Sequence, residues 1–322
     1  MNAAANASRD EDLLVSIPND AGLAAAIGEV PGARLVTWDL DGPPPHEAFD
    51  IVMPPYWGGP RRLARLEGVQ VRLVQWQSIG YDRVADYLPE GIPLANAASV
   101  HEASTAELAI ALALVAQRGI ADFVRSGDRG VWERPAMRPS LADRRVLIVG
   151  YGGVGKAIDA RLVGFETSVT RIARTARSEA GPGGEPVPVL GMDRLHEALA
   201  EAEIVIVGVP LDAGTRGLID AAALAAMPDG ALLVNVARGA VVDTDALMAE
   251  LNSGRLRAAL DVTDPEPLPE GHPLWSCPGL IVSPHVGGDS TAYVPRMARL
   301  LHRQVERMRR GEHPENLVDL SR

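Results

Sequence analysis

The sequence predicts an α/β protein of two lobes, each built on a doubly wound parallel sheet, with a cleft between the lobes. Short apolar runs rich in β-branched residues alternate with Ala- and Leu-rich helical stretches along the 322 residues, and this alternation is typical of parallel sheets. The alternating series starts twice, near residue 13 and again near residue 146. The chain is also long enough for two separate cores.

The first series predicts the lobe at the N-terminal side. Its expected strands are residues 13–17, 34–38, 51–53 and 73–76, each followed by turn residues. A helix is expected over residues 20–27, with Asp20 as its cap, and a long helix over residues 103–118.

The second series predicts a doubly wound nucleotide-binding domain. Expected strands are residues 146–149, 168–172, 204–207, 231–234, 258–260 and 280–282, and expected helices are 155–163, 192–200, 220–227 and 244–252. Residues 178–188 are rich in Gly and Pro and predict a surface loop. A last helix, 291–310, could return to the first lobe. We therefore expect residues 1–98 with 290–322 to form the substrate (catalytic) domain and residues 99–289 the dinucleotide-binding domain.

Composition and charge exclude several classes of protein. The net charge of −11 argues against a surface for nucleic acid or anionic membrane, because both need concentrated positive charge. Cys277 is the only cysteine, which excludes an internal disulfide and a cysteine-based zinc site. Residues 9–12 are charged where a signal peptide needs an apolar stretch, and the longest apolar run, 108–116, is about half of a membrane span. A cytoplasmic location is the natural expectation.

A glycine-rich motif follows the first strand of the second series. It consists of Gly150, Tyr151, Gly152, Gly153, Val154 and Gly155. A G-x-G-x-x-G match alone is a weak signal, but here it follows an apolar strand and opens a helix, the context that a Rossmann-like dinucleotide site requires. The alternative is a glycine-rich structural turn. We expect the helix N-terminus to bind the phosphates of a dinucleotide.

The end of the next strand bears on the choice of cofactor. NAD-binding proteins usually place an acidic residue there, about 20 positions after the first glycine, but residues 171–177 contain no acid. Arg174 and Thr175, with help from Arg177, would suit the 2′-phosphate of NADP, because guanidinium binds phosphate in a bidentate fork. A solvated basic turn that tolerates either cofactor is the alternative. The sequence therefore favours NADP over NAD.

Three later segments offer a guanidinium, a carboxylate and an imidazole, in Arg238, Glu266 and His285. A histidine titrates near pH 6.5 and can give a proton to a developing alkoxide. A carboxylate beside it favours the imidazolium, so Glu266 should raise the pKa of His285. Arg238 stays charged and can bind a substrate carboxylate. Each residue taken singly could be structural, but together they predict hydride transfer to a small 2-oxo acid, without a metal.

These segments carry a family resemblance. The chain resembles the D-isomer-specific 2-hydroxyacid dehydrogenases, and most of all their glyoxylate/hydroxypyruvate reductase-like members. The match runs from about residue 76 to residue 288, and it is most specific in residues 209–217, 235–242, 261–268 and 283–288. The first 70 residues resemble the family only in pattern.

The resemblance implies roles for individual residues. Arg238 should bind the substrate carboxylate and carbonyl oxygen, His285 should be the general acid/base, and Glu266 should hydrogen-bond the histidine. The backbone amides of Ser78, Ile79 and Gly80 should hold the substrate carboxylate. Further cofactor-binding positions are Val209, Pro210, Thr215, Ala237, Asp261 and Gly287. The family usually forms dimers through the nucleotide-binding lobe, so a homodimer is expected.

The chain also departs from the family pattern. Glu166 stands where relatives commonly have a glycine, so the turn before the second strand could differ. Tyr56 and Trp57, in an early loop, could narrow the mouth of the pocket. His101 is a possible residue of the cleft, although a surface or interlobe histidine is the simpler interpretation.

The leading hypothesis is an NAD(P)H-dependent reduction of a small 2-oxo acid to the D-2-hydroxy acid, with glyoxylate and hydroxypyruvate as first candidates. A phosphoglycerate dehydrogenase-like activity is an alternative within the same family. A formate dehydrogenase is disfavoured, because that relative carries an amide where this chain has Glu266. From another class, the same fold serves as a nucleotide-sensing co-repressor without turnover.

Overall fold

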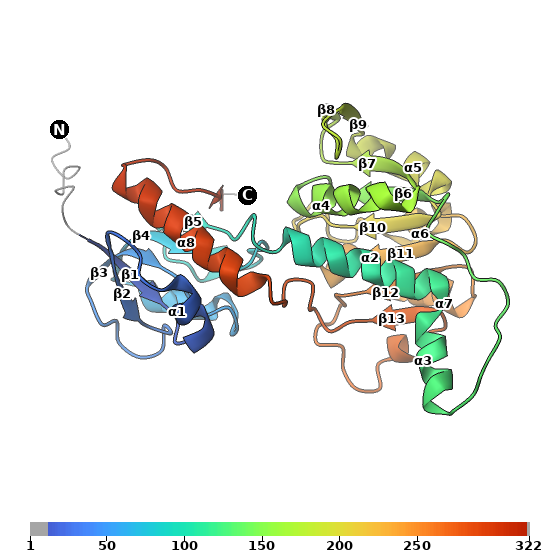
Figure 1. Ribbon diagram of the computed structural model, residues 1–322, viewed down its shortest axis with the longest axis horizontal. Helices are drawn as coiled ribbons and strands as arrows, with labels where there is room; N and C mark the ends of the chain where they lie inside the picture. The colour runs from blue at the N-terminus through green and yellow to red at the C-terminus, as the bar shows by residue number, and fades with distance from the viewer. Residues whose placement is uncertain (1–11, 321–322) are drawn as a thin grey trace. The chain divides into compact units, whose positions relative to one another are not determined.

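The computed structural model describes residues 12–320 (Figure 1). The charged positions 9–11, which argue against a signal peptide, lie outside the described residues. The chain divides into two compact units, one of Met1–His101 with Thr291–Arg322 and one of Glu102–Ser290. In the described part of the chain, no helix has both the length and the apolar content that a membrane span needs.

The first unit is built on a six-stranded sheet in the order β14-β5-β4-β3-β1-β2. The sheet is parallel except for β14, which pairs antiparallel with β5. In chain order the elements of this unit are β1 (Leu13–Ile17), α1 (Ala21–Ile27), β2 (Ala33–Thr37), β3 (Ala48–Val52), η1 (Pro60–Leu66), β4 (Gln70–Gln75), η2 (Val84–Asp86), β5 (Leu94–Ala95), α8 (Tyr293–Arg309) and β14 (Leu317–Val318).

The side chains of this sheet alternate between two cores. Ile51 and Leu73 pack with α1 and α8 on one face, while Val52 and Val74 pack with the 3-10 helices η1 and η2 on the other. This alternation is the two-residue period of a strand. The predicted cap of α1 is confirmed, because Asp20 Oδ1 accepts a hydrogen bond of 2.9 Å from the Leu23 amide.

The second unit carries a six-stranded sheet in the order β13-β12-β11-β10-β6-β7, all parallel. In chain order its elements are α2 (Glu102–Arg118), α3 (Ile120–Asp128), β6 (Arg145–Val149), α4 (Gly153–Leu162), η3 (Val163–Phe165), β7 (Ser168–Ile172), β8 (Arg177–Ala180), β9 (Pro186–Val189), η4 (Met192–Arg194), α5 (Leu195–Glu201), β10 (Ile204–Val207), α6 (Ala221–Ala226), β11 (Leu232–Asn235), η5 (Gly239–Val241), α7 (Thr244–Asn252), β12 (Arg257–Leu260), η6 (Pro273–Ser276) and β13 (Leu280–Val282). The predicted α/β class with two mainly parallel sheets is confirmed.

Helices cover both faces of this second sheet, as the α/β pattern predicts. Ile148, Ile206 and Val234 pack on one face with α2 and α4, while neighbouring strand residues face α5, α6 and α7. The chain order reverses between β6 and β10, since β7 lies on one side of β6 and β10 on the other. Ligands of open α/β sheets bind at the carboxyl ends of the strands at such a reversal.

Two local predictions are corrected by the structure. Residues 178–188 are not a plain loop, because most of them form the antiparallel hairpin β8–β9. Val187 and Val189 are buried on one side of this hairpin, a two-residue period that the intervening prolines obscure. The helix α3 was not predicted at all. Glu166, the departure from the family glycine, does adopt the left-handed conformation, with φ of 56°.

Candidate active site

The glycine-rich turn at the end of β6 has the shape that a dinucleotide needs. A Cβ on Gly155 would lie 2.1 Å from the carbonyl oxygen of Gly150, so only glycine allows α4 to start this close to the strand. Gly152 instead faces open space and caps α4 without a side-chain hydrogen bond. The first turn of α4 can therefore offer its amides and its partial positive charge to a pyrophosphate. The residues present fit a dinucleotide.

A buried ion pair between α4 and β7 supports this turn. Asp159 of α4 accepts hydrogen bonds from Arg171 Nε at 2.7 Å, from Arg171 Nη2 at 3.0 Å and from the Tyr151 hydroxyl at 2.6 Å. Burial and the contact with Asp159 raise the pKa of Tyr151 to about 12. Tyr151 therefore holds the turn to the helix through its ring, while its backbone remains at the cofactor end of the strand.

The basic residues in and after β7 differ in what they contact. Arg171, inside the strand, points to the buried Asp159, while Arg174 forms an exposed ion pair of 2.6 Å with Asp212. Arg177 donates a hydrogen bond of 2.9 Å to the Tyr151 carbonyl and pairs with Glu179. Arg177 thus contacts the glycine-rich turn, and Arg174 contacts the loop after β10.

One acidic residue of the hairpin forms ion pairs with two basic side chains of the second unit. Glu179 of β8 pairs with Lys156 at 2.8 Å and with Arg177 at 2.6 Å. The hydrogen bond from Lys156, and then that from Arg177, lowers the pKa of Glu179. The hairpin is thereby fastened to α4 beside the glycine-rich turn.

The loop after β10 lies against the glycine-rich turn. A Cβ on Gly150 would lie 2.7 Å from the Gly208 carbonyl, so the two strand ends are in contact there. The Thr215 hydroxyl donates to the Pro210 carbonyl at 2.6 Å and accepts from the Asp212 amide at 2.8 Å. Thr215 therefore shapes the loop that contains Pro210, while Val209 and Ala237 are buried at the neighbouring strand ends.

Arg238 follows the end of β11 and is positioned through its backbone. The Asn235 side chain donates to the Arg238 carbonyl at 3.0 Å and accepts from the Ala237 amide at 3.0 Å. A Cβ on Gly239 would lie 2.0 Å from the Thr263 carbonyl. The loops after β11 and β12 are therefore in backbone contact, which brings Arg238 near the segment that carries Glu266.

His285 and Glu266 form a close pair. Glu266 Oε1 contacts His285 Nδ1, and the Thr263 amide donates to Glu266 Oε2 at 3.4 Å. Burial acts to raise the pKa of Glu266, but the hydrogen bond and charge of His285, the Thr263 amide and the charge of Arg238 together outweigh it, and the pKa is lowered. Glu266 is therefore a carboxylate at neutral pH, so His285 Nδ1 donates to it and Nε2 is the nitrogen left for chemistry.

Asp261 gives the segment around His285 its shape. Its carboxylate accepts from the Ser283 hydroxyl at 2.6 Å and from the amides of Val286 and Gly287 at 2.9 Å each. His285 itself has φ of 56°, and its amide donates to the Asp261 carbonyl at 2.8 Å. This left-handed conformation is uncommon for a residue with a side chain, and the Asp261 contacts on both sides hold it.

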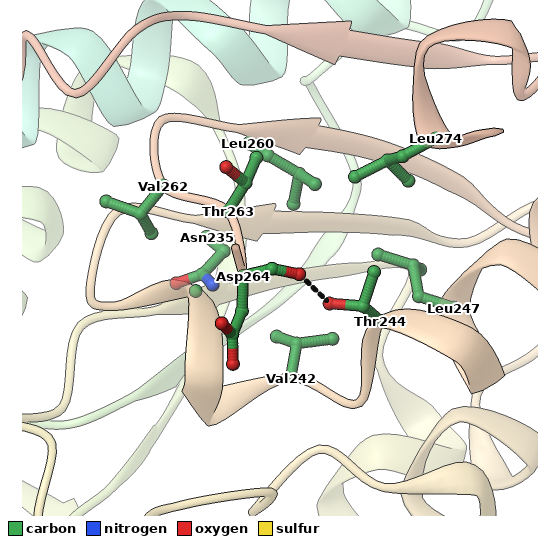
Figure 2. Close-up of a pocket in the computed structure, with 10 residues that line it drawn as sticks. Asn235, Val242, Thr244, Leu247, Leu260, Val262, Thr263, Asp264 and Leu274 are labelled. Carbon is green, nitrogen blue, oxygen red and sulfur yellow. Dashed lines mark hydrogen bonds between the residues drawn. The ribbon is translucent and has the colours of Figure 1, made fainter. Parts of the chain in front are cut away.

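A cavity of about 10 Å³ lies beside these loops (Figure 2). Leu247, Leu260 and Leu274 form much of its wall, and the Thr244 hydroxyl donates to the Asp264 carbonyl at 3.0 Å across it. This volume is about that of one water molecule, so the cavity is far too small for a substrate. Its wall supports the loops that carry Arg238 and Glu266.

In the first unit, hydrogen bonds to the backbone carbonyls of the predicted carboxylate-binding loop hold it in place. The Ala97 amide donates to the Ser78 carbonyl at 3.0 Å, the Asn96 side chain to the Ile79 carbonyl at 2.9 Å, and the Trp76 indole to the Gly80 carbonyl at 2.9 Å. Because these carbonyls accept hydrogen bonds from the protein, the groups of the loop that can bind an anion are its backbone N–H groups.

The three residues left open in that unit, Tyr56, Trp57 and His101, lie together. Tyr56 stacks on His101 with ring centroids 5.7 Å apart, and Trp57 packs edge-on against Tyr56 at 4.9 Å. His101 is buried and its Nε2 lies 2.7 Å from the Gln77 carbonyl, so it is not a surface histidine, while its interpretation as an interlobe histidine stays a prediction. Within residues 12–320, no group of His, Cys, Asp and Glu side chains has the arrangement of a metal site.

Sequence reasoning missed several residues that shape the site. Asn235, Asp159 and Gln77 are all buried polar residues at or beside an element that carries the site. Asn235 is the last residue of an otherwise apolar strand, and a polar residue at that place is a signal that could have been noticed. Asp159, in the middle of a helix, offers no such signal without its partner Arg171.

Comparison with known proteins agrees with this geometry. The NAD-binding domain of D-isomer-specific 2-hydroxyacid dehydrogenases matches residues 110–287. A glyoxylate reductase of Pyrococcus furiosus is 35% identical over 266 residues, which cover 78% of this chain and 76% of that protein. A glyoxylate reductase of Thermococcus onnurineus is 33% identical over 263 residues, which cover 78% and 77%.

Solved structures share the fold over nearly the whole chain. A D-isomer-specific 2-hydroxyacid dehydrogenase from Xanthobacter autotrophicus, in complex with NADPH and MES, has a TM-score of 0.77 at 31% identity and covers 96% of this chain and 98% of its own. An NADPH-dependent glyoxylate/hydroxypyruvate reductase from Sinorhizobium meliloti has a TM-score of 0.80 at 23% identity, with 96% and 98% covered, and shows likeness of fold.

Two α/β units with mainly parallel sheets, of which the second carries both a dinucleotide turn and a histidine–carboxylate pair, are typical of a nicotinamide-dependent oxidoreductase. With the matches above, the chain belongs to the D-isomer-specific 2-hydroxyacid dehydrogenase family. It is an NAD(P)-dependent enzyme of that family.

Proposed function

We propose that this enzyme reduces a small 2-oxo acid to the D-2-hydroxy acid. The observation that carries the proposal is the contact between Glu266 and His285, in the same unit as Arg238 and the dinucleotide turn. The chemistry that a reduced nicotinamide supplies when bound is a hydride for the carbonyl carbon of the substrate. The residues of the chain have to bind the acid, stabilise the developing alkoxide and deliver a proton.

His285 is the proton donor in this proposal. Its Nδ1 is directed to Glu266, so Nε2 gives its proton to the alkoxide oxygen and recovers one from that oxygen in the reverse reaction. The Glu266 carboxylate holds the orientation of the ring by accepting from Nδ1. Asp261 in turn holds the backbone of the segment.

Arg238 and the loop of Ser78, Ile79 and Gly80 bind the substrate anion. Arg238 carries a permanent charge and can contact both the carboxylate and the carbonyl oxygen, where negative charge increases during hydride transfer. The loop contributes N–H groups, since its carbonyls are engaged by Asn96, Trp76 and Ala97.

NADP is the preferred cofactor in this proposal. Arg174 and Arg177 lie in the first residues after β7, and Arg174 is two-thirds exposed and pairs with Asp212. A 2′-phosphate can replace that carboxylate, because phosphate binds guanidinium through a charge-assisted fork. Thr175 would add a hydroxyl donor. The cofactor turn itself, with Gly150, Gly152 and Gly155, serves NAD and NADP alike.

Glyoxylate and hydroxypyruvate are the first substrates to test, since the relatives in the comparison carry the name glyoxylate reductase. The decisive experiment measures initial rates of NADPH and NADH oxidation with glyoxylate, hydroxypyruvate, pyruvate, phenylpyruvate and 2-oxoglutarate. The configuration of the product is then determined by chiral chromatography. The proposal predicts turnover with NADPH and a D-product. Tight cofactor binding without turnover of any acid would instead favour the co-repressor hypothesis.

We also propose that the enzyme is a homodimer through its second unit. Helix α3 and the segment that follows it expose Phe123, Val124, Trp132 and Met137, with Trp132 90% and Met137 98% exposed. Apolar side chains gathered on one segment are typical of an interaction surface. Light scattering on the full chain should give twice the mass of 34.1 kDa. The double variant Val124→Asp, Trp132→Ser should give the monomer mass, whereas a wild-type monomer contradicts the proposal.

A further inference from the structure

Gln77 joins three separate segments of the first unit next to the carboxylate-binding loop. It lies two residues beyond β4 and directly before Ser78, and it is 2% exposed. Its Nε2 donates to the Pro54 carbonyl at 2.6 Å, and its Oε1 accepts from the Tyr293 hydroxyl of α8. Its own carbonyl is 2.7 Å from His101 Nε2. The amide nitrogen, the amide oxygen and the backbone carbonyl of this residue therefore each have a partner in a different segment.

The chemistry of the partners allows only one orientation of the amide. The Pro54 carbonyl can only accept, so the NH₂ group must face it and the amide oxygen must face Tyr293. The Gln77 carbonyl can likewise only accept, so His101 carries its proton on Nε2. Since the amide sits in a buried site, loss of any of these bonds would leave a polar group unsatisfied.

Stacked rings fix the partners in place. His101 stacks on Tyr293 with centroids 5.3 Å apart and an interplanar angle of 14°, and Tyr56 lies 4.7 Å from Tyr293. His101 is the last residue of the first unit before the chain enters the second, and Tyr293 comes shortly after the chain returns at Thr291. Two partners of Gln77 therefore lie next to the points where the chain leaves the first unit, at His101, and where it returns, near Tyr293.

We propose that Gln77 is a positioning residue for the substrate carboxylate. This inference rests on the proposed function, in which the amides of Ser78, Ile79 and Gly80 bind that group. Gln77 holds the loop where it leaves the sheet, while Ala97 and Asn96 hold the carbonyls further along. Without the amide of Gln77, the loop N–H groups lose their fixed direction toward an anion, although the cofactor turn in the second unit is untouched.

The chain offers a matched control in Gln304 of α8. This residue is also fully buried, and it makes three hydrogen bonds, to Gln75 Oε1 at 2.7 Å, to the Glu315 carbonyl at 2.9 Å and from the Glu315 amide at 2.8 Å. None of these bonds reaches residues 78–80. Replacement by Met keeps the length of the side chain at either position and removes its hydrogen bonds.

The test compares Gln77→Met, Gln304→Met and Tyr293→Phe with the wild-type full chain. Measurements are KM and kcat for the best 2-oxo acid, KM for NADPH, the melting temperature, and the Kd of oxamate, an unreactive analogue of a 2-oxo acid, by calorimetry with NADPH present. Gln77→Met should raise the KM for the acid and the Kd of oxamate roughly 10-fold, as loss of about one hydrogen bond would. The KM for NADPH should stay within about twofold of the wild type.

Tyr293→Phe keeps the ring stack and removes only the hydroxyl, so it should move the oxamate Kd in the same direction by a smaller factor. Gln304→Met should lower the melting temperature as much as Gln77→Met and leave the oxamate Kd unchanged. If Gln77→Met changes only the melting temperature, or if Gln304→Met weakens oxamate equally, Gln77 has no positioning role.

The inference and the proposed function can fail separately. A wild-type protein that turns over no 2-oxo acid and binds no oxamate overturns the proposed function and this inference together. A wild-type protein that is active and binds oxamate, with a Gln77→Met variant that binds it equally well, overturns the inference alone.

Discussion

Replacing Glu266 with Gln removes the charge beside the His285 ring and keeps a side chain of the same size. In the wild type, Glu266 Oε1 contacts His285 Nδ1, and the pKa of Glu266 is lowered because the contacts with His285, the Thr263 amide and Arg238 together outweigh burial. The ionised carboxylate accepts from Nδ1 and so holds the ring with Nε2 directed to chemistry. An amide forms a weaker hydrogen bond than a charged carboxylate does, so the Gln variant should have a lower rate of reduction than the wild type.

The size of the effect follows from the exposure of the pair. The side chains of His285 and Glu266 are 43% and 37% exposed, so solvent screens their interaction to about 1 kcal/mol. An interaction of about 1 kcal/mol that acts in the transition state corresponds to roughly a fivefold change in rate. The kcat/KM for 2-oxo acid reduction should fall by about that factor in Glu266→Gln.

The assay is the initial rate of NADPH oxidation at neutral pH over a range of 2-oxo acid concentrations, which gives kcat/KM. Glu270→Gln is the matched control, because Glu270 is an exposed acid further along the same segment. Its kcat/KM should equal that of the wild type. If Glu266→Gln also keeps the wild-type kcat/KM, the carboxylate does not act on the proton donor and the reasoning is wrong.

The same variant makes a prediction for stability. A carboxyl group whose pKa is lowered in the folded state stabilises the fold above its ordinary pKa of 4.5, and this contribution is lost as the pH falls through the lowered value. Glu266→Gln should be less stable than the wild type by up to about 1 kcal/mol at neutral pH, and the difference should shrink in acid. Urea unfolding at several pH values measures this, and a pH-independent difference contradicts it.

Three further substitutions test other parts of the site. Arg174→Ala should raise the KM for NADPH roughly 10-fold and leave that for NADH nearly unchanged, because only NADPH has a 2′-phosphate for the guanidinium; equal losses would show that Arg174 does not distinguish the cofactors. Gly239→Ala places a Cβ 2.0 Å from the Thr263 carbonyl, so activity and melting temperature should both fall, and an unaltered melting temperature contradicts the close approach of these loops. Asp159→Asn leaves the buried Arg171 without a charged partner and should cost about 3 kcal/mol in urea unfolding; a cost near zero would mean that the pair does not support the turn.

Much of the second unit could be predicted from the sequence because its strands are short, apolar and parallel. In such a sheet the carboxyl ends of all strands lie on one edge, so residues far apart in the chain meet there. Arg238 and His285 follow the strands β11 and β13, and Glu266 lies beyond β12. This rule alone predicts that the three residues lie at the same edge, wherever the intervening helices are.

The parts that could not be predicted depend on side-chain partners. The sequence places Arg171 in the same basic run as Arg174, but the alternation along β7 directs Arg171 to Asp159 and leaves Arg174 exposed. Gln77 and Tyr293 are 216 residues apart, and no local pattern relates them. The hairpin β8–β9 was missed because Pro and Gly, which usually indicate a loop, occupy alternate positions of its second strand and its turn.

The most direct test of the central claim compares the wild type with His285→Ala in two measurements on the same preparations. One is the rate of NADPH oxidation with the best 2-oxo acid, and the other is NADPH binding by calorimetry. A proton donor predicts a loss of turnover of roughly 10²-fold or more with NADPH binding nearly unchanged. Unchanged turnover in His285→Ala would contradict the assignment of this histidine and with it the proposed reaction mechanism.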